Sequence, residues 1–178
     1  MLQARSIAEA RLFMSLEPCA CGHRGFEHPS KIVAHGERLA AVASGYCESC
    51  GTMRSFELML ADARVPDGAW GNAEPSTLID AGGWLALADH FGAQVPASIE
   101  RLDRDVRDQA RANLQRGIAA VGEILKFFPA GAAEPPRSAF FTPRGLEIYV
   151  ADRRRFTRDR LQVLIEAWRE LADSFVEN

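Results

Sequence analysis

The 178-residue sequence lacks any apolar run near the roughly 18 residues that a membrane-spanning helix needs. Its first apolar stretch is interrupted by Arg5, Glu9 and Arg11, which excludes the hydrophobic region of a secretory signal. We therefore expect a cytoplasmic protein with no membrane partner. The chain also lacks a G-x-S-x-G elbow, a Walker-type loop, a dinucleotide-binding glycine pattern and H-E-x-x-H. This favours a binding protein over an enzyme.

Lysine is scarce, since only Lys31 and Lys126 are lysines among 21 basic residues, and the net charge is −3. A chain of this charge lacks the broad basic face that binds phosphate backbones, so nucleic acid is the less favoured partner. Residues 65–97 contain no lysine or arginine at all. Their charged residues are acidic, namely Asp67, Glu74, Asp80 and Asp89.

This acidic stretch also contains two tryptophans. Aromatic side chains among carboxylates are typical of a surface that binds a basic protein. The predicted contact surface consists of Asp67, Trp70, Glu74, Asp80 and Trp84. The sequence leaves open the alternative that both tryptophans lie in the core and that the acids only solvate a loop and a helix.

Four cysteines occur in two close pairs, Cys19-Ala-Cys21 and Cys47-Glu-Ser-Cys50, and a glycine follows each pair. Close pairs in a reducing compartment favour a metal site over disulfides. Four thiolates about 2.3 Å from one Zn²⁺ complete a closed tetrahedral shell. The spacing therefore predicts a structural zinc site formed by all four cysteines.

Other ligand sets are open at this point. His23, His28 or His35 could replace Cys19 or Cys21 as a ligand, which would leave a position for water and permit hydrolytic chemistry. A redox role for the C-x-x-C pair is less favoured, because no βαβ pattern surrounds it.

Residue alternation predicts the strands of a small β module. The clearest strand covers Thr52–Leu60, and shorter ones cover Lys31–His35 and Glu37–Ser44 with a turn at Gly36. Before them, Ser6 and the glutamate three residues later fit a capping box for a short helix. Residues 12–16 fit a strand equally well.

Helical spacing dominates the remainder. We expect a helix capped by Ser76 that ends near Phe91, in which Gly82-Gly83 indicates close packing or a break. Apolar residues three and four apart predict a long helix from Ser98 to Phe127 and a last helix after Thr157. Residues 145–150 fit a short helix or a strand. The fold class is therefore α+β, with a zinc-ribbon-like β module at 1–62 packed against a helical domain at 63–178.

An arginine cluster precedes the last predicted helix and consists of Arg153, Arg154, Arg155 and Arg158. Arginine in the first turn opposes the helix macrodipole, so the cluster could bind a phosphate or carboxylate together with free backbone N–H groups. The favoured alternative is that these arginines pair with acids elsewhere in the chain, including those of residues 65–97.

Residues 17–60 resemble a zinc ribbon, with Cys-x-Cys-Gly and Cys-x-x-Cys-Gly as its knuckles. Zinc ribbons occur in nucleic-acid binders, in protein-interaction modules and as structural supports. The chain is also similar, in the runs Ser6–Gly22 and Pro75–Leu85, to small uncharacterised proteins of GC-rich bacteria, some of which are encoded beside secreted toxins. This second resemblance implies an immunity or antitoxin protein.

Three functional hypotheses follow from the sequence. The leading one is a non-catalytic, zinc-stabilised protein-binding module, an immunity or antitoxin protein that inhibits a basic toxin enzyme. The alternative is a nucleic-acid- or nucleotide-binding regulator that uses the ribbon and the arginine cluster. The third is a metal-dependent hydrolase with a histidine ligand.

Overall fold

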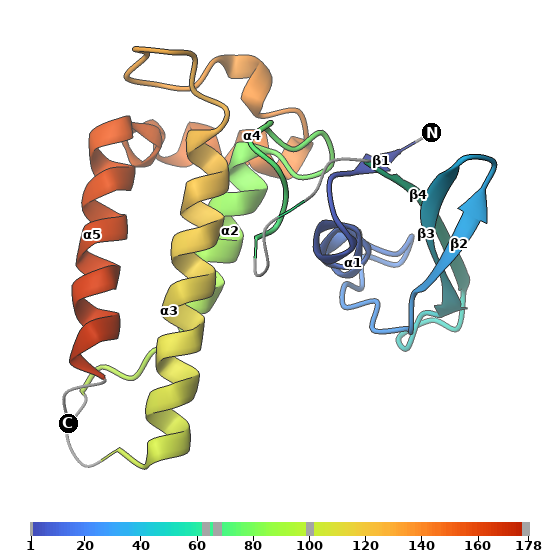
Figure 1. The fold of residues 1–178 in the computed structure, drawn as a ribbon, viewed down its shortest axis with the longest axis horizontal. Coiled ribbons are helices and arrows are strands. Elements are labelled where there is room, and N and C mark those ends of the chain that lie inside the picture. Colours follow the sequence, from blue (N-terminus) through green and yellow to red (C-terminus); the bar gives the residue numbers. More distant parts are fainter. Residues whose placement is uncertain (1, 62–64, 66–68, 99–101, 176–178) are drawn as a thin grey trace. The chain divides into compact units, whose positions relative to one another are not determined.

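A computed structural model describes residues 2–61, 65, 69–98 and 102–175 of the chain. It combines helices with a four-stranded sheet, so the predicted α+β class is confirmed. Contacts divide the protein into two compact units, Met1–Ile79 with the sheet and Asp80–Asn178 with most of the helices (Figure 1). Composition had placed the boundary after residue 62. No described helix has the length and hydropathy to cross a membrane.

The sheet of the first unit has the strand order β1-β4-β3-β2. Its strands are β1 Gln3–Ala4, β2 Lys31–His35, β3 Arg38–Tyr46 and β4 Met53–Leu60. The last three form an antiparallel meander, and β1 pairs with β4 in parallel. Gly36, at φ +64°, lies in the predicted turn between β2 and β3. The three strands expected from alternation are thus confirmed, with ends displaced by two residues at most.

Helix α1, Ile7–Leu16, decides the open question about residues 12–16 in favour of a helix. Ser6 is its N-cap and accepts a 3.0 Å hydrogen bond from the Glu9 backbone N–H, as a capping box requires. The Glu9 carboxylate, however, accepts from the backbone N–H and the guanidinium of Arg5. Both side chains are buried, so removal of either would leave an uncompensated charge.

Residues 69–79 belong to the first unit because the start of α1 binds them. Arg5 donates from its guanidinium to the Glu74 carbonyl, and Ser6 Oγ donates to the Trp70 carbonyl at 2.6 Å. Ser76 Oγ accepts from the backbone N–H groups of Leu78 and Ile79. This part of the acidic stretch is therefore a loop folded against α1.

In its described residues, the second unit contains four α-helices and two 3-10 helices. These are α2 Ala81–Gly92, α3 Arg104–Leu125, η1 Arg137–Ala139, α4 Pro143–Ala151, η2 Arg153–Phe156 and α5 Arg158–Ser174. Helix α3 packs against both α2 and α5, and α2 also packs against α4 (Figure 1). Leu114, Val121 and Ile124 of α3 are fully or almost fully buried, as the predicted apolar stripe requires.

Two predicted helix starts are wrong. Helix α2 begins after Asp80 instead of Ser76, because Asp80 accepts from the Gly83 backbone N–H at 2.7 Å and acts as the N-cap. Helix α3 begins after Asp103 instead of at Ser98, and residues 99–101 of the predicted helix lie outside the described residues. At 145–150 the structure has a helix, α4, capped by Thr142.

Asp80 joins the starts of two helices. Its second carboxylate oxygen accepts from the backbone N–H and the hydroxyl of Thr142, both at 2.8 Å. A Cβ atom on Gly145 would collide with this carboxylate, and one on Gly82 would collide with the Gly145 backbone. The close packing expected at Gly82 is confirmed, since α2 and α4 meet there backbone to backbone.

This contact predicts the effect of a single methyl group. We expect Gly145→Ala to destabilise the helical unit by about 1–3 kcal/mol, because the added carbon forces the Asp80 carboxylate or the α4 backbone to move. Urea unfolding followed by circular dichroism at the helix band measures this. Gly122→Ala in α3 is the matched control, because its Cβ meets nothing within 4 Å. It should stabilise the unit by roughly 0.5–1 kcal/mol. Equal effects of both substitutions would contradict the contact.

Candidate metal centre

The first cysteine pair lies in a tight turn just after α1. The Gly22 backbone N–H donates to the Cys19 carbonyl at 2.7 Å, and the Cys19 N–H donates to the His23 carbonyl at 2.8 Å. Gly22 has a φ of +86°, which a residue with a side chain adopts only with strain. This turn directs both sulfur atoms, those of Cys19 and Cys21, to the same side.

The second pair occupies the loop between β3 and β4. The Gly51 N–H donates to the Cys47 carbonyl at 2.8 Å, and the Cys47 N–H donates to the Thr52 carbonyl at 2.9 Å. Gly51 has a φ of +69°. The two strands therefore hold a second turn of similar form, and the hairpin delivers Cys47 and Cys50 to the first pair.

The four sulfur atoms lie within 4.8 Å of one another. Cys19 Sγ lies 3.7 Å from Cys50 Sγ, and Cys21 Sγ lies 3.8 Å from Cys47 Sγ. Sulfurs about 2.3 Å from a central Zn²⁺ are about 3.8 Å apart along each edge of a regular tetrahedron. The donor set and its spacing thus fit a tetrahedral metal ion, and the predicted clustering of the four cysteines is confirmed.

The thiols differ in acidity. A hydrogen bond with the Thr52 side chain, 3.2 Å from Cys50 Sγ, and then one from the Thr52 backbone lower the pKa of Cys50 to about 6. The His23 backbone N–H lowers the pKa of Cys21, but hydrogen bonds with neighbouring sulfurs and partial desolvation outweigh it and raise this pKa to about 11. Of these two thiols, Cys50 therefore loses its proton much more readily than Cys21.

No histidine joins this group in the described part of the chain. His28 Nε2 lies 3.0 Å from the Tyr46 carbonyl oxygen, and His35 Nδ1 lies 2.9 Å from Glu57 Oε1. His23 contributes its backbone carbonyl to the first turn. The sulfur set is therefore complete without the histidine ligand that the sequence left open.

An aromatic cluster supports the turns from beside the sheet. The Phe26 ring is buried and packs on His28 and Phe56, with centroid distances of 4.6 and 4.9 Å. The Arg54 guanidinium lies 5.1 Å from the Phe26 centroid and 5.0 Å from that of Phe56, and it donates to the Glu17 carbonyl at 2.7 Å. The His28 ring covers Gly45, where a Cβ atom would collide with it.

Tyr46 and Met53 were missed as functional candidates. They are cross-strand partners at the ends of β3 and β4, so their side chains share one face. Tyr46 is 63% exposed and Met53 is 59% exposed. The sequence of β4 could have indicated them. Ser55 and Glu57 follow Met53 at alternate positions, so the three share one face, and the two polar side chains mark that face as exposed to solvent.

The acidic surface predicted between residues 65 and 97 does not form as expected. Trp84 is 0% exposed and Asp80 is 1% exposed, so neither offers a contact to a partner. Trp84 packs in the helical core, and Asp80 caps α2. Trp70 is half-buried and Glu74 is exposed, whereas Asp67 lies outside the described residues.

Three of the four arginines in the predicted cluster contact other residues of the chain through their side chains. Arg155 forms a bidentate ion pair with Asp89 at 2.9 and 2.5 Å, as the favoured alternative anticipated, and this hydrogen bonding raises the pKa of Arg155. Arg158 donates to the Ala132 carbonyl at 3.0 Å and covers the Phe128 ring. Arg153 lies over the Tyr149 ring, at 5.3 Å from its centroid, while Arg154 is exposed.

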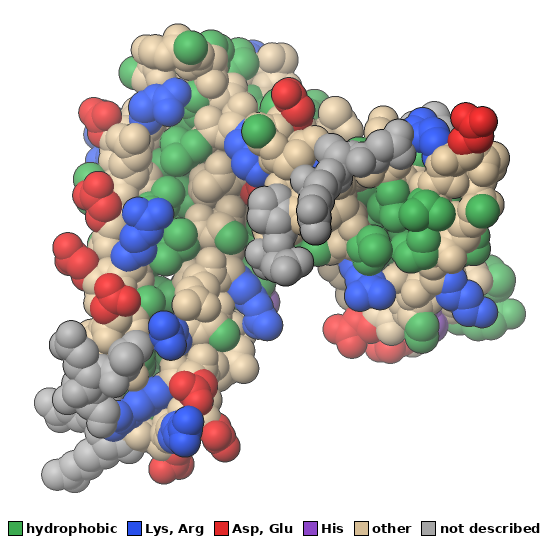
Figure 2. All heavy atoms as spheres, in the orientation of Figure 1, with side chains coloured by type: hydrophobic (Ala, Val, Ile, Leu, Met, Phe, Trp, Pro, Cys, Tyr) green, Lys and Arg blue, Asp and Glu red, His purple; other side chains and the backbone are tan. Residues whose placement is uncertain are grey.

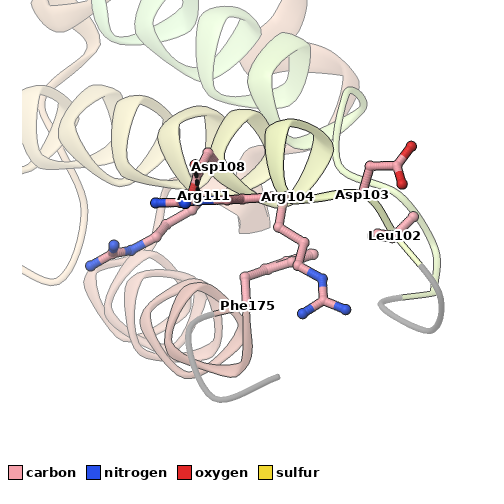
Figure 3. Close-up of a pocket in the computed structure, with 7 residues that line it drawn as sticks. Leu102, Asp103, Arg104, Asp108, Arg111 and Phe175 are labelled. Atoms are coloured by element: carbon pink, nitrogen blue, oxygen red, sulfur yellow. Dashed lines mark ion pairs between the residues drawn. The ribbon is translucent and has the colours of Figure 1, made fainter.

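A separate cavity of about 550 Å³ lies between the start of α3 and the end of α5 (Figure 3). Its lining residues are Leu102, Asp103, Arg104, Arg107, Asp108, Arg111 and Phe175. Arg104 already pairs with Asp108 at 3.8 Å, so the two acids offset much of the cationic charge. None of these seven described lining residues is a cysteine, serine or histidine that could act as a nucleophile or general base.

Comparisons of the chain with protein-family models, with curated proteins and with solved structures gave no match.

The aromatic cluster predicts an indirect effect on metal binding. Phe26→Ala should weaken metal affinity at least tenfold, because removal of a buried ring costs about 3–5 kcal/mol and metal binding is coupled to folding of the turns. Competition with a chromophoric chelator measures the affinity. Phe141→Ala, at an exposed phenylalanine of the helical unit, is the control and should leave it unchanged. Unaltered affinity in Phe26→Ala would show that the cluster does not support the site.

Proposed function

We propose that the chain is a zinc-stabilised, non-catalytic protein-binding module. The observation that carries this proposal is the cluster of four cysteine sulfurs within 4.8 Å of one another, in which two S–S distances of 3.7 and 3.8 Å match the edge of a zinc–thiolate tetrahedron. Zn²⁺ is the ion that four thiolates in this geometry favour. Cys19, Cys21, Cys47 and Cys50 each supply one ligand, and together they join the turn after α1 to the β3–β4 hairpin.

The ligand count supports a structural role for the ion. Catalytic zinc sites keep one of their positions for water or substrate, whereas four cysteine ligands fill a tetrahedral shell. Cys19 and Cys47 are buried, and Cys21 and Cys50 are exposed, so the ion lies at the edge of the unit. Zinc here fixes the direction of two chain segments.

The sheet next to the metal supplies the binding surface in this proposal. The Tyr46–Met53 pair directly adjoins the second cysteine turn, so a metal bound there would fix the backbone from which both side chains project. Exposed aromatic and methionine side chains are enriched in the centres of protein interfaces. Hydrophobic side chains are also visible on the surface of the sheet-bearing unit, among charged ones (Figure 2).

An immunity or antitoxin role for this module stays a prediction that rests on the resemblance in residues 6–22 and 75–85. The acidic contact surface that would bind a basic toxin loses Asp80 and Trp84 to the core. A partner should therefore be sought at the sheet. The nucleic-acid alternative loses Arg155 and Arg158 to intramolecular contacts, and the hydrolase alternative has no histidine in the metal group of the described residues.

Removal of the metal should unfold the first unit and leave the second unit folded. We expect chelation to release one zinc ion per chain and to unfold the β2–β4 sheet, because the cysteine turns hold it together. Helices α2–α5 have their own buried stripe and should keep most of the helical circular dichroism signal. Elemental analysis and amide NMR spectra measure both effects. A full loss of helical signal would contradict the structural independence of the second unit.

Partner capture tests the binding surface. The tagged protein, purified from a nuclease-treated native lysate, should retain a stoichiometric protein that the double variant Tyr46→Ser, Met53→Ser loses. Both side chains are exposed, so the variant should fold and keep its zinc. The matched control is Val150→Ser, Val163→Ser, two exposed positions of the helical unit. A partner that both variants retain would contradict this surface.

A further inference from the structure

The outer edge of the sheet is formed by β2, Lys31–His35. All five of its residues are exposed, and β3 is its one neighbour in the described sheet. Backbone N–H and C=O groups on the outer side of such a strand are available to an added strand. Proteins commonly protect an edge with prolines, bulges or many charges, but here Ile32, Val33 and Ala34 stand in succession.

One face of this edge is cationic. Strand register places Lys31, Val33 and His35 on the same face, together with Arg38 opposite His35. His35 is paired with Glu57 at 2.9 Å. Among the described residues, Lys31 and Arg38 have no ion-pair partner. Two unpaired cations therefore flank the exposed Val33 side chain.

The other face of the edge is apolar. Ile32 is 39% exposed, and Leu39, on the neighbouring β3, is 52% exposed. Leu39 is the cross-strand partner of Ala34, which lies two residues from Ile32 on the same face. A strand added beside β2 would extend this apolar patch on one face and meet the cations on the other.

We propose that β2 binds an extended segment of a partner protein by strand addition, and that this segment alternates acidic and apolar residues. The acidic side chains lie on the face of Lys31 and Arg38, and the apolar side chains cover Ile32 and Leu39. Main-chain hydrogen bonds supply affinity, and the alternation supplies specificity. This inference rests on the proposed protein-binding function and names the chemistry of the partner.

A second copy of this chain fits the edge less well. Two copies of β2 that pair antiparallel are related by a two-fold axis perpendicular to the sheet. The same face of each copy then lies on the same side of the combined sheet. The cationic side chains of both copies, those of Lys31 and Arg38, would then share one face and repel each other. Charge complementarity thus favours a different, acidic segment.

A defined peptide tests this inference on the full-length, zinc-loaded protein. The probe is a capped heptapeptide of alternating glutamate and valine, with a lysine–valine peptide as its charge-reversed counterpart. The acidic probe should shift the amide NMR signals of Lys31–His35 and slow their hydrogen exchange. It should bind at least tenfold more tightly than the lysine–valine peptide.

Two further comparisons separate strand addition from simple charge attraction. In an extended peptide, every second backbone N–H faces β2 and the others face away from it. We therefore use two probes, one N-methylated at the first alternate set of residues and one at the second. The probe that has lost the N–H groups facing β2 should bind at least tenfold more weakly. The double variant Lys31→Glu, Arg38→Glu should reverse the preference between the two peptides, whereas Arg104→Glu in the helical unit should not change it. Lys31 and Arg38 are both exposed, so the double variant should fold, and an unchanged zinc content checks that it does.

The outcomes distinguish this inference from the function on which it rests. No binding of the acidic probe at millimolar concentration, or equal binding of both methylated probes, would overturn strand addition. If a captured partner still depends on Tyr46 and Met53, the protein-binding function then stands. Self-association through β2, detected as a dimer that Lys31→Glu strengthens, would also overturn the acidic partner.

Discussion

The first unit depends on the meeting of two turns far apart in sequence, which bring four cysteine sulfurs within 4.8 Å of one another. Cys19 Sγ lies 3.7 Å from Cys50 Sγ and Cys21 Sγ lies 3.8 Å from Cys47 Sγ, so each cysteine of one turn contacts a cysteine of the other. The buried residues of β3 are Ala40, Ala41 and Ala43, whereas the larger buried side chains beside it come from Phe26 and from Leu58 of β4. Alanine buries little surface, so a metal ion bound by the four sulfurs would add stability where β3 contributes little.

Much of this unit could be predicted from short-range patterns. Alternation gave β2 to β4, glycine gave the turn at Gly36, and cysteine spacing gave the metal group. These features depend on residues within a few positions of each other, where chain geometry decides the outcome. The exposed pair Tyr46 and Met53 was missed, because alternation separates two faces of a strand without showing which one is covered.

Long-range contacts explain what could not be predicted. Ser76 and Asp80 are both good helix caps, and the hydrogen bonds of Asp80 with Thr142, distant in sequence, accompany its role at the start of α2. Trp84 looked like a surface residue because of its acidic neighbours, yet it is fully buried among helices. Arg155 likewise pairs with Asp89 on α2. Sequence can suggest such pairs but cannot rank them.

The glycine contact between α2 and α4 has a mechanical consequence. With Gly82 against Gly145, the backbones of the two helices are in direct contact, and the Asp80 carboxylate lies against Gly145. A shift of α4 toward α2 at this point would therefore bring backbone atoms into collision. Helix α4 also carries Tyr149, which stacks on Phe140 and contacts Phe156, so these rings move with it. The starts of α2 and α4 and these three rings therefore form one tightly packed part of the helical unit.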